Sequence, residues 1–383
     1  MSTLDVPPRL VILGDNLTAL GVARDAASLR LEPVIVDYTR GPAIASRRYD
    51  HRIVPNDERS TVDAIAKLAA VSHANIIATG DAWLRFIVRN RAALDGAILH
   101  APNDVLETCL DKIRFANWCV ANGINAPRHW IGTAASIPDD LKFPLLVRPA
   151  VTLHSMPAPP VPKATEVVDA PALAELLRQF RDAGVTPLVC ESLLSQRLTQ
   201  FSVPFARDAS GSMRSFVAAK VRPPPHWCRV GTYVELSPDV RAEALARDVV
   251  SKLACFGIGE VEILFSHDSG EYFVVEVNAR PWLQYPLAMA SGHDFLAFLL
   301  GLSNVGAVPR KHGLRWLEFR SDLYTCFSRS EGLYWHGGLT TAGYVRSLWN
   351  ANVFPTSAPR VSHASDSGHS VLHRMWTRVR SSR

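Results

Sequence analysis

Apolar residues in the first hundred positions come in short runs that alternate with segments of helical spacing. Residues 9–13 form an apolar run that ends in a glycine turn, and residues 17–29 have the spacing of a helix. Residues 32–38 form a second apolar run, and a helical segment near 60–70 and a strand from Asn75 continue the alternation. Strands that alternate with helices predict a parallel sheet with ligands bound near the strand carboxyl ends.

The turn after the first strand, from Gly14 to Gly21, does not match the G-x-G-x-x-G pattern of dinucleotide-binding proteins. Asp15, Asn16 and Asp81 follow predicted strands, so their side chains could contact an acceptor substrate. For Asp15 and Asn16 we favour a second interpretation, in which they cap a helix.

Two strands near residue 270 carry polar groups that packing explains poorly. The segments 259–265 and 271–281 are otherwise apolar and β-branched, and the polar turn 266–270 joins them. Glu262 lies on the first strand, and the second carries three polar residues at alternate positions, which are Glu276, Asn278 and Arg280. Residues two apart on an extended strand project from the same face. Two carboxylates and an amide oxygen suit Mg²⁺, and a neighbouring guanidinium suits a phosphate. The alternative is a polar strand face that meets solvent, which fits Glu262 alone better than the four residues together.

The chain between these two regions also alternates predicted helices and strands. A helix at 105–122 contains Asp111 and Lys112, and a strand at 143–149 contains Arg148. An unpaired charge within an apolar strand is costly, so we expect a phosphate partner for Arg148.

The segment 150–162 contains four prolines and no glycine, which predicts a stiff, exposed loop. Further strands and helices are predicted after it, at 163–168, 172–183 and 187–194. A β-rich stretch at 201–236, which contains Lys220 and Arg222, and an amphipathic helix at 238–256 lead to the two polar strands.

Composition narrows the class of protein. The 383 residues are 48% hydrophobic and 20% charged, as in a folded soluble protein with two or three domains. Of the net charge of +5, the segment from Arg360 onward contributes +4, from five arginines and one acid. The remainder is nearly neutral, so we expect no nucleic-acid partner. Six cysteines without a C-x-x-C pair, and a start without a secretory signal, predict reduced thiols and a cytoplasmic protein.

The last twenty residues contain a pattern typical of a basic amphipathic helix. Apolar residues recur at helical spacing opposite three arginines, and these apolar residues are Val371, Leu372, Met375, Trp376 and Val379. Such a helix suits peripheral contact with a membrane surface. Packing against its own protein, or against a second copy in a homodimer, is an equal alternative.

The order of these elements resembles the ATP-grasp superfamily, in particular its carboxylate–amine ligase-like branch related to carbamoyl phosphate synthase. The matching motifs, in chain order, are S-R-R-Y at 46–49, D-K at 111–112, F-P-L-L-V-R-P at 143–149, V-C-E-S-L-L at 189–194, K-V-R at 220–222, G-E-V-E-I-L at 259–264 and E-V-N-A-R-P at 276–281. The resemblance implies an α/β fold in which a Rossmann-like parallel-sheet domain precedes two α+β subdomains that clamp a nucleotide. The implied units are an N-terminal domain at 1–105, a small subdomain at 106–186, a large subdomain with the metal site at 187–300, a C-terminal extension at 301–360 and a basic tail at 361–383.

The resemblance also implies roles for individual residues. Lys112 and Arg148 would hold the nucleotide phosphates. The hinge, whose backbone would meet adenine, comprises Glu191, Ser192, Leu193 and Leu194. The ligands of one or two Mg²⁺ ions, with Mn²⁺ as an alternative, would be Glu262, Glu276 and Asn278. Arg280, with Lys220 or Arg222, would stabilise the oxygens of an acyl phosphate.

Three features depart from the family pattern. Arg148 stands where the family has a lysine, and arginine keeps the charge without being equivalent. The segment 150–162 lacks the glycines whose N–H groups normally reach the phosphates, and its prolines have no N–H at all. After the hinge, residues 196–200 offer amides and Arg197 but no acid for the ribose.

The implied activity is an ATP- and Mg²⁺-dependent ligase that activates a carboxylate as an acyl phosphate and joins it to an amine. Phosphoryl transfer of this kind depends on positioning and electrostatic stabilisation. An amino acid or peptide is the expected class for at least one substrate. Two alternatives stay open: a nucleotide- or metabolite-binding protein without turnover, and a bicarbonate-activating enzyme of the carbamoyl phosphate type.

Overall fold

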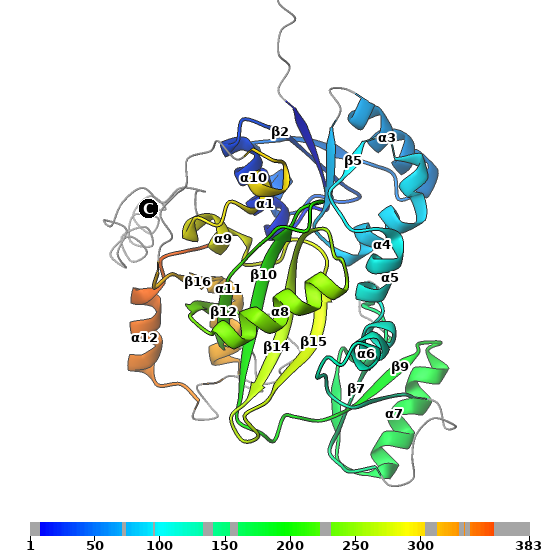
Figure 1. The fold of residues 1–383 in the computed structure, drawn as a ribbon, viewed down its shortest axis with the longest axis vertical. Helices are drawn as coiled ribbons and strands as arrows, with labels where there is room; N and C mark the ends of the chain where they lie inside the picture. The colour runs from blue at the N-terminus through cyan, green and yellow to red at the C-terminus, as the bar shows by residue number, and fades with distance from the viewer. Residues whose placement is uncertain are drawn as a thin grey trace, which may run out of the picture.

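The computed structural model describes residues 8–70, 74–94, 96–132, 141–153, 160–222, 231–302, 312–328, 333 and 338–355. The expected amphipathic helix at 371–379 and the middle of the proline-rich segment, 154–159, lie outside these residues. The described part is built around three β-sheets (Figure 1).

A five-stranded parallel sheet forms the N-terminal part, in the order β3-β2-β1-β4-β5. Its strands are β1 (Arg9–Leu13), β2 (Glu32–Asp37), β3 (Asp50–Ile53), β4 (Asn75–Ala78) and β5 (Ala97–Ile98). The helical segments between them are α1 (Leu17–Ser28), α2 (Pro42–Ala45), α3 (Glu58–Ala70), α4 (Asp81–Asn90) and η1 (Arg91–Ala93). Leu10 to Leu13 are fully buried, because helices cover both faces of such a sheet. The apolar runs at the start of the chain predicted this arrangement.

The turn after β1 confirms the capping interpretation. Asn16 accepts a hydrogen bond from the Ala19 N–H and caps α1. The Asp15 carboxylate accepts hydrogen bonds from three N–H groups at the start of α2, those of Gly41, Ala43 and Ile44. Side chains of the protein itself therefore accept hydrogen bonds from the free backbone N–H groups at the N-termini of both helices.

A four-stranded antiparallel sheet follows, in the order β6-β9-β7-β8. Its strands are β6 (His129–Ile131), β7 (Leu145–Pro149), β8 (Thr165–Val167) and β9 (Pro187–Glu191). Helices α5 (Asn103–Leu110) and α6 (Lys112–Ala121) lead into it, and α7 (Ala170–Asp182) packs on it through Leu173, Leu176 and Phe180. Because β9 pairs with β6 and β7, this unit extends to Glu191. The boundary expected at residue 186 is therefore one strand too early, since pairing and not chain order decides which sheet a strand joins.

The third sheet is antiparallel, in the order β15-β14-β10-β12-β13-β16, with β11 beside β10. Its strands are β10 (Leu198–Arg207), β11 (Met213–Ser215), β12 (Val217–Arg222), β13 (Tyr233–Ser237), β14 (Gly257–Ser266), β15 (Tyr272–Asn278) and β16 (Arg315–Leu317). The helix α8 (Val240–Lys252) lies across it in Figure 1. Strand β16 comes from the expected C-terminal extension, so that extension completes the sheet.

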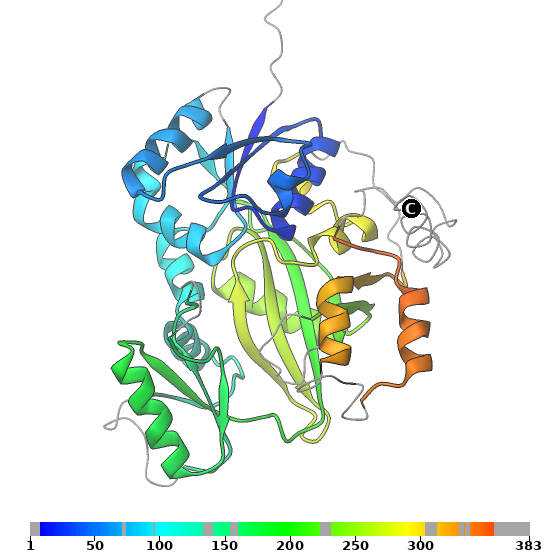
Figure 2. The same ribbon diagram turned by 180° about the vertical axis from the view of Figure 1, so that it is seen from behind.

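The remaining helices are α9 (Tyr285–Ser291), α10 (Phe295–Leu299), α11 (Phe319–Phe327) and α12 (Thr341–Asn350). Figures 1 and 2 show the N-terminal sheet above one end of the third sheet, with the four-stranded sheet beside the other end. Leu10 and Ile12 share an apolar core with Trp282 and Tyr285, so the first and third units pack together closely. Among the described residues, no helix has the length and apolar character needed to cross a membrane.

Candidate functional site

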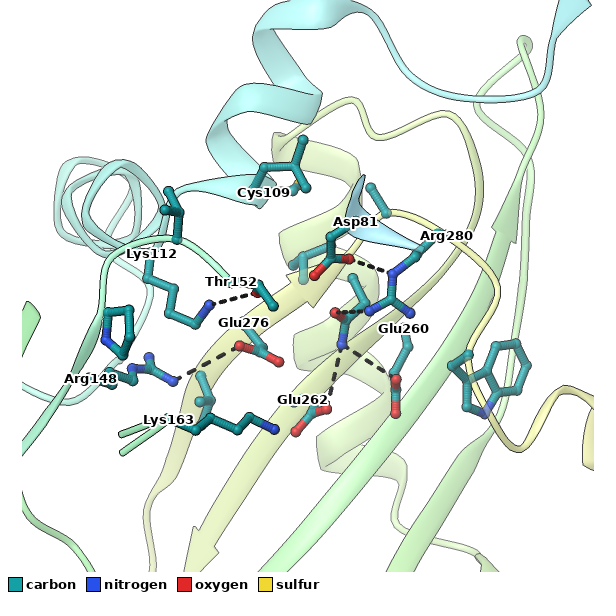
Figure 3. Close-up of a pocket in the computed structure, with 18 of the residues that line it drawn as sticks. Asp81, Cys109, Lys112, Arg148, Thr152, Lys163, Glu260, Glu262, Glu276 and Arg280 are labelled. Atoms are coloured by element: carbon teal, nitrogen blue, oxygen red, sulfur yellow. Dashed lines mark hydrogen bonds and ion pairs between the residues drawn. The ribbon is translucent and has the colours of Figure 1, made fainter. Parts of the chain in front are cut away.

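A cavity of about 610 Å³ lies where the three units meet. The N-terminal sheet contributes Thr79, Gly80 and Asp81 to its lining, and the four-stranded sheet contributes Arg148 and Cys190. Strands β14 and β15 of the third sheet contribute Glu260, Glu262 and Glu276, which form the acidic wall of the cavity (Figure 3). The carboxyl edge of the N-terminal sheet therefore faces a ligand-sized cavity, as predicted for such a sheet.

The acidic wall is set by the pairing of β14 with β15. Glu262 lies opposite Glu276, and Glu260 lies opposite Asn278. All four side chains line the cavity, which places the three expected metal ligands together. The Asn278 amide nitrogen is 3.5 Å from both Glu262 Oε1 and Glu260 Oε2.

Positive side chains from the second unit face this wall. The predicted helix at 105–122 is two helices, because Asp111 has extended dihedrals and caps α6 by accepting from the N–H groups of Ile113 and Arg114. Lys112 therefore begins α6 and points into the cavity, where its Nζ lies 3.4 Å from Thr152 Oγ1. Burial lowers the pKa of Lys112, and Glu276 offsets part of that effect.

Arg148 approaches the same carboxylate from β7, with Nη1 3.9 Å from Glu276 Oε2. Burial by itself would raise the pKa of Glu276, but the charges of Lys112 and Arg148 hold it below its usual value. Lys163, which also lines the cavity, adds a third positive charge near Glu276. Charges arranged in this way around a buried carboxylate are typical of a phosphate-binding site.

Lys220 lies on the acidic side, and its side chain is only 3% exposed. Its Nζ is 3.0 Å from Glu262 Oε1 and 3.8 Å from Glu260 Oε1. Burial opposes the charged form, but Glu262 and Glu260 raise the pKa of Lys220 above its usual value. Glu260 also accepts a hydrogen bond from Ser202 Oγ, and burial raises the pKa of Glu260 despite the neighbouring lysine.

Arg280 follows β15 and completes this end of the cavity. Its Nε donates a hydrogen bond of 2.5 Å to Asp81 Oδ1, and its Nη2 lies 3.4 Å from Asn278 Oδ1. Burial by itself would raise the pKa of Asp81, but the Arg280 guanidinium lowers it to about 2. The ion pair is therefore charged at neutral pH.

The chemistry of the acidic wall fits a magnesium ion. Glu262, Glu276 and Asn278 offer hard oxygen ligands, and the buried Gln200 Oε1 beside them has no hydrogen-bond partner among the described residues. No group of three or more His, Cys, Asp and Glu side chains in the described ranges could hold a metal by itself. An ion here would therefore depend on Asn278, on water and on phosphate oxygens, which is the usual way in which proteins bind Mg²⁺.

The expected hinge is brought to the cavity in part. Glu191, Leu193 and Leu194 line it, next to apolar residues suited to an adenine ring, which include Leu146, Val161 and Leu264. The Glu191 carboxylate accepts hydrogen bonds from the Arg128 backbone and side chain at 2.9 and 3.1 Å. Ser192 is not part of the lining, and its Oγ donates instead to Glu166. Val161 is buried, so this part of the predicted exposed loop is a wall of the cavity.

Arg222 is not brought into the cavity, which corrects its expected catalytic role. Its Nε and Nη2 each donate a hydrogen bond of 2.8 Å to Asp322 of α11. Its guanidinium carbon lies 4.1 Å from the centroid of the Tyr233 ring. The pairing of β12 with β13 is irregular between Lys220 and Arg222. Asp322 is 100 residues away in sequence, so this buried partner could not be read from the motif.

Sequence reasoning did not assign a role to four residues that line the cavity, which are Thr152, Lys163, Gln200 and Glu260. For Glu260 a signal was present, because it lies two residues before Glu262 on one strand. The other three come from separate segments, and only the packing of the units places them here.

No family model and no curated protein matches this sequence. Solved structures do match. N5-carboxyaminoimidazole ribonucleotide synthetase from Thermotoga maritima has a TM-score of 0.59 and 16% identity, over 80% of this chain and 79% of that one. L-amino acid ligase from Bacillus licheniformis has a TM-score of 0.58 and 17% identity, over 80% and 75%.

A third match is the biotin carboxylase domain of Hydrogenobacter thermophilus 2-oxoglutarate carboxylase, a dimer in complex with MgADP, ADP and bicarbonate. Its TM-score is 0.60 at 14% identity, over 79% of this chain and 71% of that one. The chain spans only 29% of Rhizobium etli pyruvate carboxylase, a longer protein with a TM-score of 0.60 and 15% identity. At these identities the likeness concerns the fold. The chain therefore has the ATP-grasp fold, as its sequence resemblance predicts.

Proposed function

We propose that this protein is an ATP- and Mg²⁺-dependent ligase that joins a carboxylate to an amine and releases ADP and phosphate. One observation carries the proposal: the cavity places Lys112 and Arg148 of one unit opposite Glu262, Glu276 and Asn278 of another. A site with cations on one wall and hard oxygen ligands on the other suits a nucleoside triphosphate with its metal ion. The ATP-grasp fold supports the same activity.

In this proposal the nucleotide lies between the four-stranded sheet and the third sheet. Lys112 and Arg148 bind its phosphates, and the backbone at Glu191 to Leu194 meets the adenine. Glu262, Glu276 and Asn278 hold a magnesium ion, which would offset charge on the phosphate oxygens. Arg148 can grip a phosphate with two parallel hydrogen bonds, which offsets the missing lysine.

The substrate end of the cavity lies near Arg280, Lys220 and Asp81. A substrate carboxylate oxygen attacks the γ-phosphorus of ATP, the bond to the β–γ bridging oxygen breaks, and ADP leaves. Arg280 and Lys220 stabilise the negative oxygens of the resulting acyl phosphate. The amine then attacks the carbonyl carbon, phosphate leaves, and the amine loses a proton to solvent as the amide forms.

An amino acid or peptide is the proposed class for at least one substrate. The amino acid ligase with the same fold supports this choice. The carboxylase domain named above, whose structure contains bicarbonate, favours bicarbonate activation as the second candidate. The two activities differ in what releases ADP, because the second needs no amine.

The first test is the melting temperature with ATP, ADP or GTP, each with and without Mg²⁺. A ligand that binds only the folded protein raises this temperature. We expect a Mg²⁺-dependent rise with the adenine nucleotides, followed by ADP release only with a carboxylate and an amine together. ADP release with bicarbonate alone would select the second candidate, and the absence of any nucleotide-dependent rise would contradict both.

The variant Glu276→Gln tests the site itself. It keeps the size of the side chain and removes the charge that contacts Arg148. We expect it to fold, to bind nucleotide less tightly in Mg²⁺, and to lose ADP release. Full Mg²⁺-dependent turnover in this variant would show that Glu276 is not a metal ligand.

A further inference from the structure

Asp81 and Arg280 join two different units of the protein inside the cavity. Asp81 begins α4 at the carboxyl edge of the N-terminal sheet, and Arg280 follows the last strand of the acidic wall. Their ion pair is 2.5 Å long, and the side chains are only 14% and 21% exposed. Both residues line the cavity, where Figure 3 shows the aspartate pointing at the guanidinium. A buried, short contact of this kind defines one orientation of the arginine.

The backbone on both sides of this pair is held by His100. Its Nε2 accepts a hydrogen bond of 2.7 Å from the Ala78 N–H, so its Nδ1 carries the proton and donates to the Ala279 carbonyl at 3.1 Å. Ala78 precedes Asp81 by three residues, and Ala279 is adjacent to Arg280. The imidazole therefore fixes the end of β4 against the end of the acidic wall. The separation of Asp81 and Arg280 is set by the fold and not by two flexible surface side chains.

The hydrogen bonds of Arg280 show which of its N–H groups remain available to a ligand. A guanidinium has five N–H donors. Within the described residues, Nε donates to Asp81, Nη1 to the Pro281 carbonyl at 3.3 Å, and Nη2 to Asn278 Oδ1 at 3.4 Å. Two N–H groups, one on each Nη, remain for oxygens of a ligand in the cavity.

Asp81 also lies near the phosphate-binding side. The Thr152 side chain, whose Oγ1 is the partner of Lys112 Nζ, helps to lower the pKa of Asp81. Positive charge from Lys112 also acts on Asp81. One carboxylate of the N-terminal unit thus pairs with the cation at the substrate end and lies near the segment beside the phosphate-binding lysine.

We propose that Asp81 is the positioning residue for Arg280, so that the N-terminal unit orients the arginine whose two remaining N–H groups hold the transferring phosphoryl group. This inference rests on the proposed function. Arginine loses side-chain freedom when it binds, and a partner that already holds Nε removes part of that cost. Asp81 itself does not touch the reacting atoms.

The test uses MgADP, with and without aluminium fluoride as a mimic of the transferring phosphoryl group. Asp81→Asn keeps the side-chain size and removes the charge. We expect MgADP to raise the melting temperature of the Asp81→Asn variant as it does that of the unaltered protein. The additional affinity for aluminium fluoride should fall roughly 10- to 100-fold, the loss expected when a binding group is misplaced. Asp81→Glu, which keeps the carboxylate, should recover part of it.

Two comparisons separate positioning from a general structural role. Glu58→Gln removes an ion pair of 2.9 Å from the other end of α4, to Arg89, and should leave aluminium fluoride binding unchanged. In an Arg280→Lys background, Asp81→Asn should cause little further loss, because its target is already gone. The Arg280 Nε–H resonance, identified by its absence in Arg280→Lys, should shift in Asp81→Asn without any ligand.

Each outcome decides between the two proposals. If Asp81→Asn kept the full additional affinity for aluminium fluoride, or left the Arg280 Nε–H resonance unchanged, the positioning role would be overturned while the ligase proposal stands. Equal losses of MgADP and aluminium fluoride binding would make Asp81 a structural residue. If MgADP does not stabilise the unaltered protein, the proposed function fails and this inference fails with it.

Discussion

Lys220 Nζ lies 3.0 Å from Glu262 Oε1 inside the cavity, so an ammonium group of the protein neutralises a carboxylate that we expect to bind a metal ion. Both groups are largely buried, and neither charge could remain there without a partner. Lys220 therefore keeps the acidic wall stable before any ligand binds. This contact leads to the first prediction.

Replacing Lys220 with methionine should destabilise the protein by about 3–5 kcal/mol in EDTA, the usual effect of breaking a buried ion pair. Added Mg²⁺ should restore part of the loss, because a divalent ion can neutralise Glu260 and Glu262 instead. Denaturant unfolding with EDTA and with Mg²⁺ measures both values. Lys252→Met, which breaks an exposed pair with Asp248, is the control and should cost less than about 1 kcal/mol. If Lys220→Met lost the same free energy of unfolding with and without Mg²⁺, the assignment of Glu262 as a metal ligand would be contradicted.

Two substitutions of Arg148 test whether an arginine in place of the family's lysine changes the affinity for MgATP. Arg148→Lys keeps a positive charge near Glu276 and should bind MgATP within several-fold of the unaltered protein. Arg148→Met removes the charge, lets the pKa of Glu276 rise, and should weaken MgATP binding by about tenfold or more. Isothermal titration calorimetry gives both affinities. Similar affinity in the methionine variant would place the phosphates elsewhere.

Stability should fall in acid because of His100. Burial lowers the pKa of His100 to about 4. Between pH 6.5 and 4 the unfolded chain binds a proton that the folded protein does not, so stability decreases as the pH falls through this window. The contribution is about 3 kcal/mol, and it is fully present above pH 6.5. Asp81, with a pKa near 2, adds a further loss only below about pH 4.

Denaturant unfolding at several pH values checks the sign and size of this effect. The variant His100→Gln cannot titrate, and its stability should depend less on pH between 6.5 and 4. A variant with the same slope as the unaltered protein would show that another group is responsible.

The new assignment of Arg222 makes a separate prediction. Arg222→Met leaves Asp322 buried without its partner and should cost about 3–5 kcal/mol, whereas the double variant Arg222→Met/Asp322→Leu should cost clearly less. Neither change touches the cavity, so both variants should keep the stabilisation by MgADP while they remain folded. Loss of that stabilisation in the folded double variant would return Arg222 to the site.

The sequence by itself determined the features that depend on local periodicity and chain order. The alternation of Glu276, Asn278 and Arg280 placed three side chains on one wall, because a strand has a period of two. The apolar runs predicted the parallel sheet, and the polar residues after the first strand predicted helix caps. The order of motifs along the chain predicted the fold, because a resemblance in motif order can be recognised without knowing which residues are close in space.

The tertiary structure decided which distant residues meet. Lys220 and Arg222 are two residues apart, yet one faces Glu262 and the other Asp322, because an irregular strand pairing and the packing of α11 separate them. Asp81 reaches Arg280 across 199 residues of sequence. Long charged side chains select their partners by burial and proximity in space, and these depend on how the three sheets pack against one another.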